Sequence, residues 1–226
     1  MRAHVAFTPS EEASAPVGIV VDVLRATSTI AQALASGYRR ILCCAEIEDA
    51  RRLRGEIAGS LVGGEREAVR IDGFDLGASP REFLEPRADT LILSTTNGTR
   101  AILRAAERCE VVLLGSLLNL AAVAEEARGR GEDVAVFCAG FKGSFALDDA
   151  YCAGRIVALL DADRSDAAIA AELVGASFPD AHTALLARTY GPPGLEEDIL
   201  FCSRESVLPV VPRLAGVTGP AAEIVA

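Results

Sequence analysis

Aromatic residues are scarce in this sequence, and tryptophan is absent. Three Tyr and eight Phe are the only aromatic residues, so the core must be built from Ala, Val, Leu and Ile. Hydrophobic residues make up 50% of the 226 positions. A chain of this length can bury roughly 70% of the surface that it exposes when extended. The composition therefore predicts a globular protein, and the length favours one domain over residues 1–226.

Long apolar runs and clusters of positive charge are missing as well. No stretch reaches the roughly 18 apolar residues that a membrane helix needs, and residues 1–5 lack the apolar segment of a signal peptide. The net charge is −10, and no run of Lys and Arg indicates a nucleic-acid partner. We therefore expect a cytoplasmic protein that binds neither membranes nor nucleic acid. Whether it forms a homodimer is left open.

Several common catalytic and binding motifs are absent. The six cysteines form no C-x-x-C pair and have no histidine at zinc spacing, which predicts reduced, half-buried thiols. The two histidines, His4 and His182, lie beside no candidate nucleophile, so a Ser-His-Asp triad is disfavoured. The sequence contains neither G-x-x-x-x-G-K-[ST] nor G-x-G-x-x-G after a strand. The usual signals of nucleotide-binding folds are therefore missing.

What is present is a regular alternation of short apolar runs and helical stretches. The predicted strands are residues 18–23, 39–44, 60–63, 90–94, 111–115 and 133–138. The predicted helices are residues 29–36, 48–56, 99–107, 118–128 and 147–160. Strands that are apolar throughout are covered on both faces. The pattern predicts a three-layer α/β/α fold with a largely parallel or mixed sheet, and the prolines of the last third predict an irregular C-terminal portion.

Polar residues follow the first of these predicted strands. In open α/β sheets, ligands bind at the carboxyl ends of strands beside helix N-termini. Asp22 ends a buried strand, which is costly unless it is paired or bound to a metal, and Arg25 offers a fork suited to phosphate, sulfonate or carboxylate. Thr27, Ser28 and Thr29 place hydroxyls at a helix N-terminus, where anions are stabilised. Alternatively, Thr27 or Ser28 only caps the helix and Asp22 pairs with Arg25.

A second polar turn follows the predicted strand at residues 90–94. It contains Thr95, Thr96, Asn97, Gly98 and Thr99. The Asn97-Gly98 pair permits a left-handed turn, and the flanking hydroxyls and amides can form an anion-binding nest. The alternative is a plain turn into a helix capped by Thr99. A second such turn in one α/β chain favours the functional interpretation.

Two further loops carry carboxylates. The Gly-rich segment 63–80 contains Glu65 and Asp75, which are hard oxygen ligands of the kind that Mg²⁺ prefers. The loop after residue 138 leads through Gly140 to Asp148 and Asp149 at a helix start. The alternatives are that single carboxylates are solvated surface and that the paired acids only complement the helix dipole. In the functional interpretation, they add metal ligands at the same sheet edge.

Taken together, these segments resemble the ComB family, the 2-phosphosulfolactate phosphatases of coenzyme M biosynthesis. The resemblance spans roughly residues 17 to 212 and keeps the order of the family's motifs. The matching motifs are residues 22–29 (D-V-L-R-A-T-S-T), 64–66 (G-E-R), 73–80 (G-F-D-L-G-A-S-P), 95–99 (T-T-N-G-T), 138–149 and 197–202 (E-D-I-L-F-C).

The resemblance implies Mg²⁺-dependent hydrolysis of 2-phospho-3-sulfolactate to 3-sulfolactate and phosphate. Alternatives are another small 2-phospho-carboxylate as the substrate, or a non-catalytic protein that binds a phosphorylated metabolite. The predicted catalytic residues are Asp22, Arg25, Glu65 and Asp148. The predicted metal ligands are Asp22, Glu65, Asp75, Asp148 and Asp149, with Asp198 behind them. The predicted substrate-binding residues are Arg25, Thr27, Ser28, Thr29, Arg66, Thr95, Thr96, Asn97, Gly98, Thr99 and Gly140.

Overall fold

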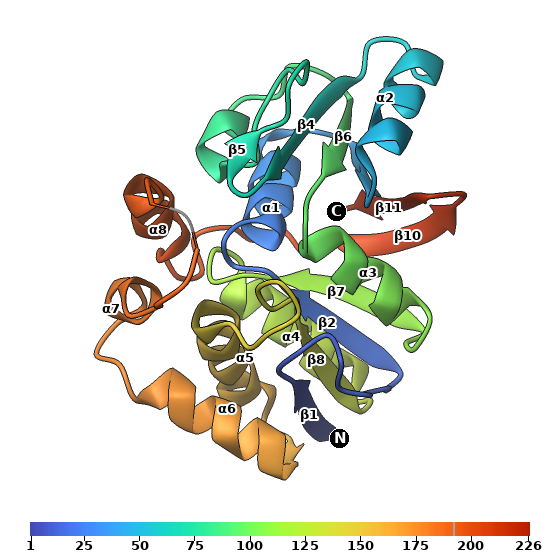
Figure 1. Ribbon diagram of the computed structural model, residues 1–226. Coiled ribbons are helices and arrows are strands. Elements are labelled where there is room, and N and C mark those ends of the chain that lie inside the picture. Colours follow the sequence, from blue (N-terminus) through green and yellow to red (C-terminus); the bar gives the residue numbers. More distant parts are fainter. Residues whose placement is uncertain (192) are drawn as a thin grey trace.

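Eleven strands form one mixed sheet in the computed structural model, which describes residues 1–191 and 193–226 (Figure 1). Their order across the sheet is β5-β4-β6-β3-β11-β10-β7-β2-β8-β1-β9. The strands are β1 (Arg2–Ala6), β2 (Val17–Val21), β3 (Arg40–Cys44), β4 (Leu61–Arg66), β5 (Val69–Arg70), β6 (Thr90–Ser94), β7 (Val111–Gly115), β8 (Val134–Cys138), β9 (Asp163–Arg164), β10 (Arg213–Thr218) and β11 (Ala221–Val225).

Helices cover both faces of this sheet, so the predicted three-layer α/β/α fold is confirmed. Within the part of the chain that the structure describes, no helix has the length and apolar character needed to cross a membrane. The helices are α1 (Ala26–Ser36), α2 (Ile47–Glu56), η1 (Pro80–Phe83, a 3-10 helix), α3 (Gly98–Ala106), α4 (Leu120–Arg130), α5 (Leu147–Leu160), α6 (Asp166–Ala176), α7 (Ala181–Leu186) and α8 (Glu196–Cys202).

The sheet consists of two parallel halves that run in opposite directions. One half contains β4, β6 and β3, and the other contains β7, β2, β8 and β1. Strands β10 and β11 form an antiparallel hairpin between them, with β11 paired to β3 and β10 paired to β7. The chain crosses from the second half to the first through α1 and returns through α3.

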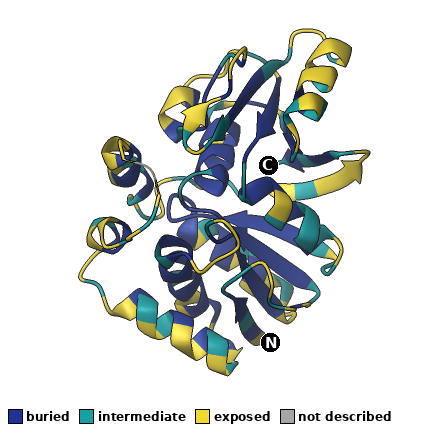
Figure 2. Cartoon of the chain, viewed as in Figure 1, coloured by how far each residue is buried: buried dark blue, intermediate teal, exposed yellow. Residues whose placement is uncertain are grey.

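Helices α1 and α3 lie between the two halves (Figure 1). Ile30 of α1 and Ile102 of α3 share one hydrophobic core with Leu93 of the first half and Leu114 of the second. The first nine residues of α1 are all buried, as the dark blue ribbon in Figure 2 shows. A helix that is buried on every side is expected where it packs between layers rather than against solvent. Gly37 ends α1 in the left-handed conformation (φ 116°).

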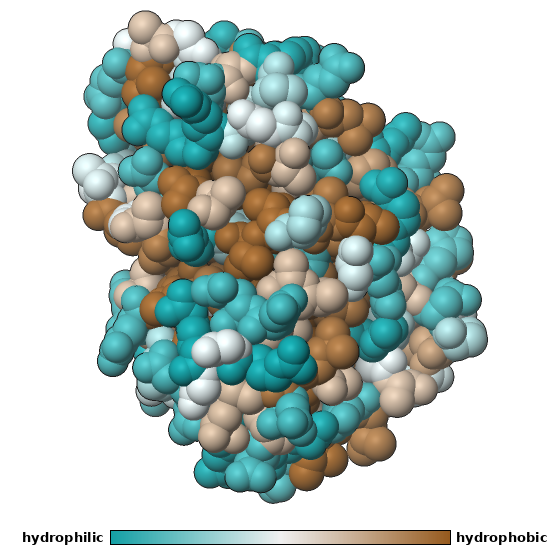
Figure 3. Space-filling model, turned by 180° about the vertical axis from the view of Figure 1, so that it is seen from behind, coloured by the Kyte–Doolittle hydropathy of each residue, from teal (hydrophilic) through white to brown (hydrophobic). Residues whose placement is uncertain are grey.

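Helices α2, α4, α5 and α6 cover the outer faces of the halves. Helices α4, α5 and α6 pack on β1, β2, β7 and β8, and α2 packs on β3, β4 and β6. On the face opposite Figure 1, hydrophobic side chains gather in a band across the middle, with hydrophilic residues above and below it (Figure 3). This band lies at the height where the two halves meet.

The predicted elements agree with the structure to within three residues at their ends, and the predictions at 90–94, 111–115 and 147–160 coincide with β6, β7 and α5. Two regions differ. Strand β1 is short and alternates Arg2 and His4 with apolar residues, so it carries no continuous apolar signal. The portion expected to be irregular ends in the β10–β11 hairpin, which turns at Gly219 in the left-handed conformation (φ 56°).

Candidate active site

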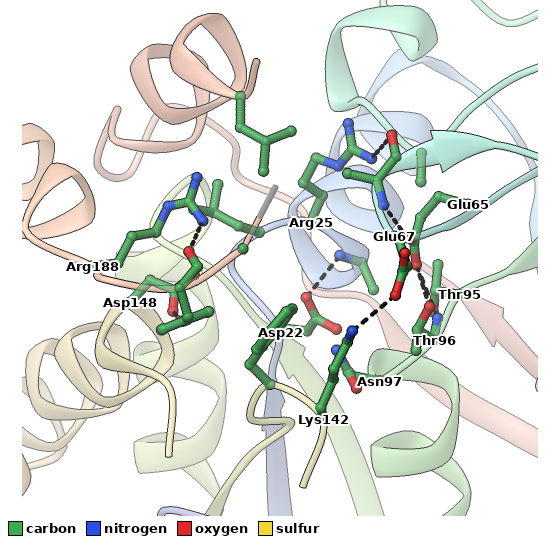
Figure 4. Close-up of a pocket in the computed structure, with 18 residues that line it drawn as sticks. Asp22, Arg25, Glu65, Glu67, Thr95, Thr96, Asn97, Lys142, Asp148 and Arg188 are labelled. Carbon is green, nitrogen blue, oxygen red and sulfur yellow. Dashed lines mark hydrogen bonds and ion pairs between the residues drawn. The ribbon is translucent and has the colours of Figure 1, made fainter. Parts of the chain in front are cut away.

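Loops from both halves of the sheet meet at one open cavity. The loops after β2 and β8 come from one half, and the end of β4 and the turn after β6 come from the other. The segment between α7 and α8 completes the wall. The lining residues are Asp22, Leu24, Arg25, Ala26, Glu65, Glu67, Ala68, Ala78, Thr95, Thr96, Asn97, Phe141, Lys142, Asp148, Arg188, Tyr190, Gly191 and Leu195 (Figure 4).

Asp22 lies at the centre of this cavity in Figure 4. It directly follows β2 and is only 7% exposed. Its Oδ1 accepts a hydrogen bond from the backbone N–H of Ala26 at 3.1 Å. The pKa of Asp22 is raised from 3.8 to about 7, chiefly by burial. The nearby carboxylates of Asp148 and Glu65 contribute to this rise, and the hydrogen bond from Ala26 opposes it. Placing Asp22 here therefore costs free energy whenever it is ionised.

Arg25 is held from behind by a carboxylate from the far end of the chain. Its Nη1 lies 2.7 Å from Oδ2 of Asp198, and both side chains are buried. The Oγ of Ser79 donates to Oδ1 of the same carboxylate at 2.5 Å, and Nη2 of Arg25 donates to the carbonyl of Ala68 at 3.2 Å. These bonds fix the guanidinium at the cavity wall. Asp198 is thus a partner of Arg25 and is not part of the lining.

Glu65 accepts hydrogen bonds from two of the segments that form the cavity. Its Oε1 accepts hydrogen bonds from the backbone N–H and the hydroxyl of Thr96, at 3.0 and 2.9 Å. Its Oε2 accepts the backbone N–H of Ala68 at 2.8 Å. The carboxylate therefore joins the end of β4 to the turn after β6, while its side chain still lines the cavity.

Asp148 and Asp149 begin α5 and take different positions. Asp148 lines the cavity and accepts a hydrogen bond from the hydroxyl of Tyr190. Burial raises its pKa, and the bond from Tyr190 opposes that rise. Asp149 is buried outside the lining, where it accepts the N–H groups of Val23 at 2.9 Å and Gly140 at 3.0 Å. Burial, followed by Asp148 and Asp22, raises the pKa of Asp149 well above its usual value.

The three hydroxyls after Arg25 turn away from the cavity. Helix α1 begins at Ala26, three residues earlier than expected, so these residues lie in its first turn and Arg25 takes the cap position without a side-chain bond. The alternative in which Thr27 or Ser28 caps the helix is therefore wrong. All three side chains are fully buried and donate to backbone carbonyls. These bonds are Thr27 to Asp22 (2.9 Å), Ser28 to Val23 (2.8 Å) and Thr29 to Ala78 (2.7 Å).

The turn after β6 lies beside Asp22. Thr95, Thr96 and Asn97 line the cavity, whereas Thr99 is buried behind them, with its N–H donating to the Thr95 hydroxyl at 3.2 Å. Asn97 has φ −109° and Gly98 begins α3. The left-handed turn that this pair permits does not form, and neither does the alternative cap at Thr99. The missing side chain of Gly98 instead leaves space for the carboxylate of Asp22. A Cβ there would lie 2.8 Å from Oδ2 of Asp22.

Asp75 and Arg66 lie outside the cavity lining. Asp75 pairs with Arg54 at 2.8 Å and accepts the N–H of Val62 at 3.0 Å, on the α2 side of the sheet. Arg66 donates to the Ala45 carbonyl at 2.8 Å and to the Ser94 hydroxyl at 3.0 Å. Arg66 thus connects the ends of neighbouring strands, whereas Asp75 connects its loop to α2 and β4. Gly140 contributes its N–H to Asp149 and is likewise absent from the lining.

Four charged or polar lining residues were not predicted from the sequence. Lys142 and Glu67 come from opposite halves of the sheet and form an exposed ion pair at 2.8 Å. Lys142 lies within the loop already singled out for its glycines, so its position could have indicated a role. Arg188 and Tyr190 belong to the segment between α7 and α8, for which the sequence offers no motif.

The cavity has the donor chemistry that a hard cation requires. Asp22, Glu65 and Asp148 supply carboxylate oxygens, and the mutual repulsion of the three acids would be relieved by a positive charge among them. No group of three or more acidic, His or Cys side chains in the described chain is close enough to hold an ion by itself. Mg²⁺ commonly takes one or two protein carboxylates and completes its shell with water and phosphate oxygens, so these residues fit such an ion.

A family model described as 2-phosphosulpholactate phosphatase matches residues 4–216. The chain belongs to this family. Similar relatives, each named a probable 2-phosphosulfolactate phosphatase, span nearly the whole chain. The relative from Thermotoga petrophila is 38% identical over 93% of this chain and 94% of its own length. The one from Carboxydothermus hydrogenoformans is 35% identical over 94% and 93%, and the one from Thermus thermophilus is 37% identical over 98% of both.

Proposed function

We propose that this member of the family is a Mg²⁺-dependent phosphatase that hydrolyses 2-phospho-3-sulfolactate to 3-sulfolactate and phosphate, a reaction of the kind used in coenzyme M biosynthesis. The observation that carries the proposal is that Asp22 and Arg25, from the loop after β2, meet Asp148, from the start of α5, in one cavity. Family membership supports the reaction type.

In this proposal the acidic residues divide into two groups. Asp22 and Asp148 would hold the metal ion, since both are buried at the lining and at a helix start or strand end. Glu65 would position the turn of Thr96, whose hydroxyl and N–H it binds. Thr27, Ser28 and Thr29 would hold the backbone around Asp22. When bound, Mg²⁺ would neutralise charge on the phosphoryl group and polarise the attacking water.

The basic and amide groups would bind the substrate. Arg25, fixed by Asp198, presents a guanidinium whose planar donors suit a phosphate or sulfonate. Thr95, Thr96 and Asn97 precede α3, and the N-terminus of this helix favours an anion. A non-catalytic anion-binding protein would have no use for three carboxylates in the same cavity, because they repel an anion unless a cation intervenes.

The test is release of inorganic phosphate from 2-phospho-3-sulfolactate, with 2-phospholactate as the alternative substrate, in the presence of Mg²⁺ or of EDTA. We expect release from phosphosulfolactate with Mg²⁺ and a loss of release with EDTA that added Mg²⁺ restores. Faster release from 2-phospholactate would indicate that the substrate is a different 2-phospho-carboxylate. Absence of metal-dependent release from either ester would refute the proposed function.

A further inference from the structure

Three cationic side chains line the cavity, and two of them are already neutralised. Arg25 forms its buried pair with Asp198 at 2.7 Å, and Lys142 pairs with Glu67 at 2.8 Å. The third, Arg188, forms no ion pair with any described carboxylate. Arg188 is therefore the lining cation without a salt-bridge partner among the described residues, and its charge also stabilises the nearby carboxylate of Asp148.

The donors of Arg188 are also incompletely used. Its Nη1 donates to the carbonyl of Tyr190 at 2.6 Å. Its Nε is buried and has no acceptor among the described residues. A buried N–H without a partner is unfavourable, and an Arg side chain carries five donors in a planar fork. An oxyanion beside Arg188 would satisfy the remaining donors and balance the charge.

The position of Arg188 separates it from the groups proposed to bind phosphate. Figure 4 shows Arg188 and Asp148 on one side of Asp22, with Arg25, Glu65 and Thr96 on the other. A ligand with a single anionic group at the Thr96 side would leave Arg188 unused. A ligand with a second acidic group could reach both sides of the cavity at once.

We propose that Arg188 binds a second acidic group of the substrate, a carboxylate or sulfonate carried on the carbon skeleton beside the phosphate ester. The inference rests on the proposed function for the identity of the ester. It assigns to the α7–α8 segment the selection of acid-bearing phosphomonoesters over neutral ones. Such a planar fork can bind a carboxylate or sulfonate through two parallel hydrogen bonds, which Lys cannot reproduce.

The test compares Arg188→Gln and Arg188→Lys with the unchanged protein. The matched control is Arg130→Gln, because Nε of Arg130 is also buried without an acceptor but lies on α4, outside the cavity lining. Binding of 3-sulfolactate and, separately, of inorganic phosphate is measured by titration calorimetry with Mg²⁺ present. Thermal unfolding of each variant checks that the fold is retained, and Arg188→Lys serves as the test variant if Arg188→Gln does not fold.

We expect Arg188→Gln to weaken 3-sulfolactate binding by roughly 10- to 100-fold, as for a lost hydrogen bond to a charged group, with a smaller loss in Arg188→Lys. Phosphate binding should change by less than about threefold, and Arg130→Gln should match the unchanged protein. Equal weakening of both ligands, or no change in either, would overturn the assignment. Arg188-dependent binding of 3-sulfolactate without any phosphate release would instead uphold Arg188 and reject the proposed phosphatase activity.

Discussion

At the scale of single residues, Asp22 is a carboxyl group that is costly to ionise. It follows a strand whose five residues are all buried, and two other acids lie near it. The free energy of this arrangement depends on pH, because burial raises its pKa from 3.8 to about 7. The folded protein thus binds this proton more tightly than the unfolded chain does. Its contribution to stability is fully present below pH 3.8 and is lost as the pH rises to about 7.

This shift predicts a pH-dependent gain in stability for Asp22→Asn in EDTA. Relative to the unchanged protein, the variant should become more stable by roughly 2–4 kcal/mol between about pH 5 and pH 8, because it has no charge to bury. Urea unfolding at both pH values measures the difference. Asp72→Asn is the control, since Asp72 is exposed outside the cavity. An equal difference at both pH values would contradict the raised pKa.

Asp198 is a positioning residue in our interpretation, because it touches Arg25 and not the cavity. Asp198→Asn should raise KM roughly tenfold with a smaller change in kcat, as the Arg25 guanidinium loses its charged partner. The measurement is steady-state release of phosphate. The control is Glu197→Gln, whose exposed pair with Arg81 should contribute little. A fall in kcat with KM unchanged would argue against this role.

At the scale of elements, the close approach of α1 and α3 shapes the cavity floor. Gly98, the first residue of α3, faces Ala26 of α1 and the carboxylate of Asp22 without room for a side chain. The same two helices make the crossovers between the halves of the sheet. Their separation at this point therefore sets where Asp22 and the turn of Thr95 and Thr96 lie.

Gly98→Ala should destabilise the protein by about 1–3 kcal/mol, because its Cβ would force α1 and α3 apart. It should also lower kcat/KM by displacing Asp22. Gly129→Ala, within α4, is the matched control, because nothing lies within 4 Å of its added Cβ. That change should stabilise the helix by about 0.5–1 kcal/mol. Denaturant unfolding and phosphate release give the two readouts, and equal stability of both variants would contradict the prediction.

The elements themselves were largely predictable from the sequence. Continuous apolar runs such as Val17–Val21 predict strands covered on both faces, and β2 is indeed buried throughout. The predicted start of α1 lies three residues too late, because Ala26, Thr27 and Ser28 make their contacts with other elements and not within the helix. These residues contact helix α3 and the backbone carbonyls that follow β2, and hydrophobic periodicity does not predict such contacts.

At the scale of the whole molecule, the C-terminal hairpin joins the two halves of the sheet. Strand β11 pairs with β3 of one half, and β10 reaches β7 of the other through Arg213 and Leu113. Ile224 of β11 is fully buried in the core that also contains α1 and α3. The hairpin is therefore expected to couple the stability of the two halves.

Ile224→Ala should destabilise the protein by about 2–5 kcal/mol and keep a single unfolding transition, because the cavity it creates lies in the shared core. Val217→Ala on β10 is the control, since Val217 is 47% exposed, and its effect should stay within about 0.5 kcal/mol. Circular dichroism and tyrosine fluorescence would follow the unfolding. Two separate transitions in Ile224→Ala would show that the halves unfold independently.

The α/β class and the polar loops at Asp22, Glu65, Thr95 and Asp148 follow from the amino-acid sequence, because hydrophobic periodicity and loop chemistry are local properties. Which of these loops meet depends on the three-dimensional packing of the chain. The carboxyl ends of parallel strands lie at one edge of a sheet. The two halves of this sheet run in opposite directions, so that rule does not explain why their loops meet. The packing of both halves around α1 and α3 does so.

The tertiary structure also determines which residues far apart in the chain become partners. Arg25 meets Asp198 across 173 positions of sequence, and Arg188 enters the cavity from a segment without a motif. The hydroxyls of Thr27, Ser28 and Thr29 point away from the cavity, because they donate hydrogen bonds to buried backbone carbonyls. Residue type shows which bonds a side chain can make, whereas the fold determines which partners are within reach.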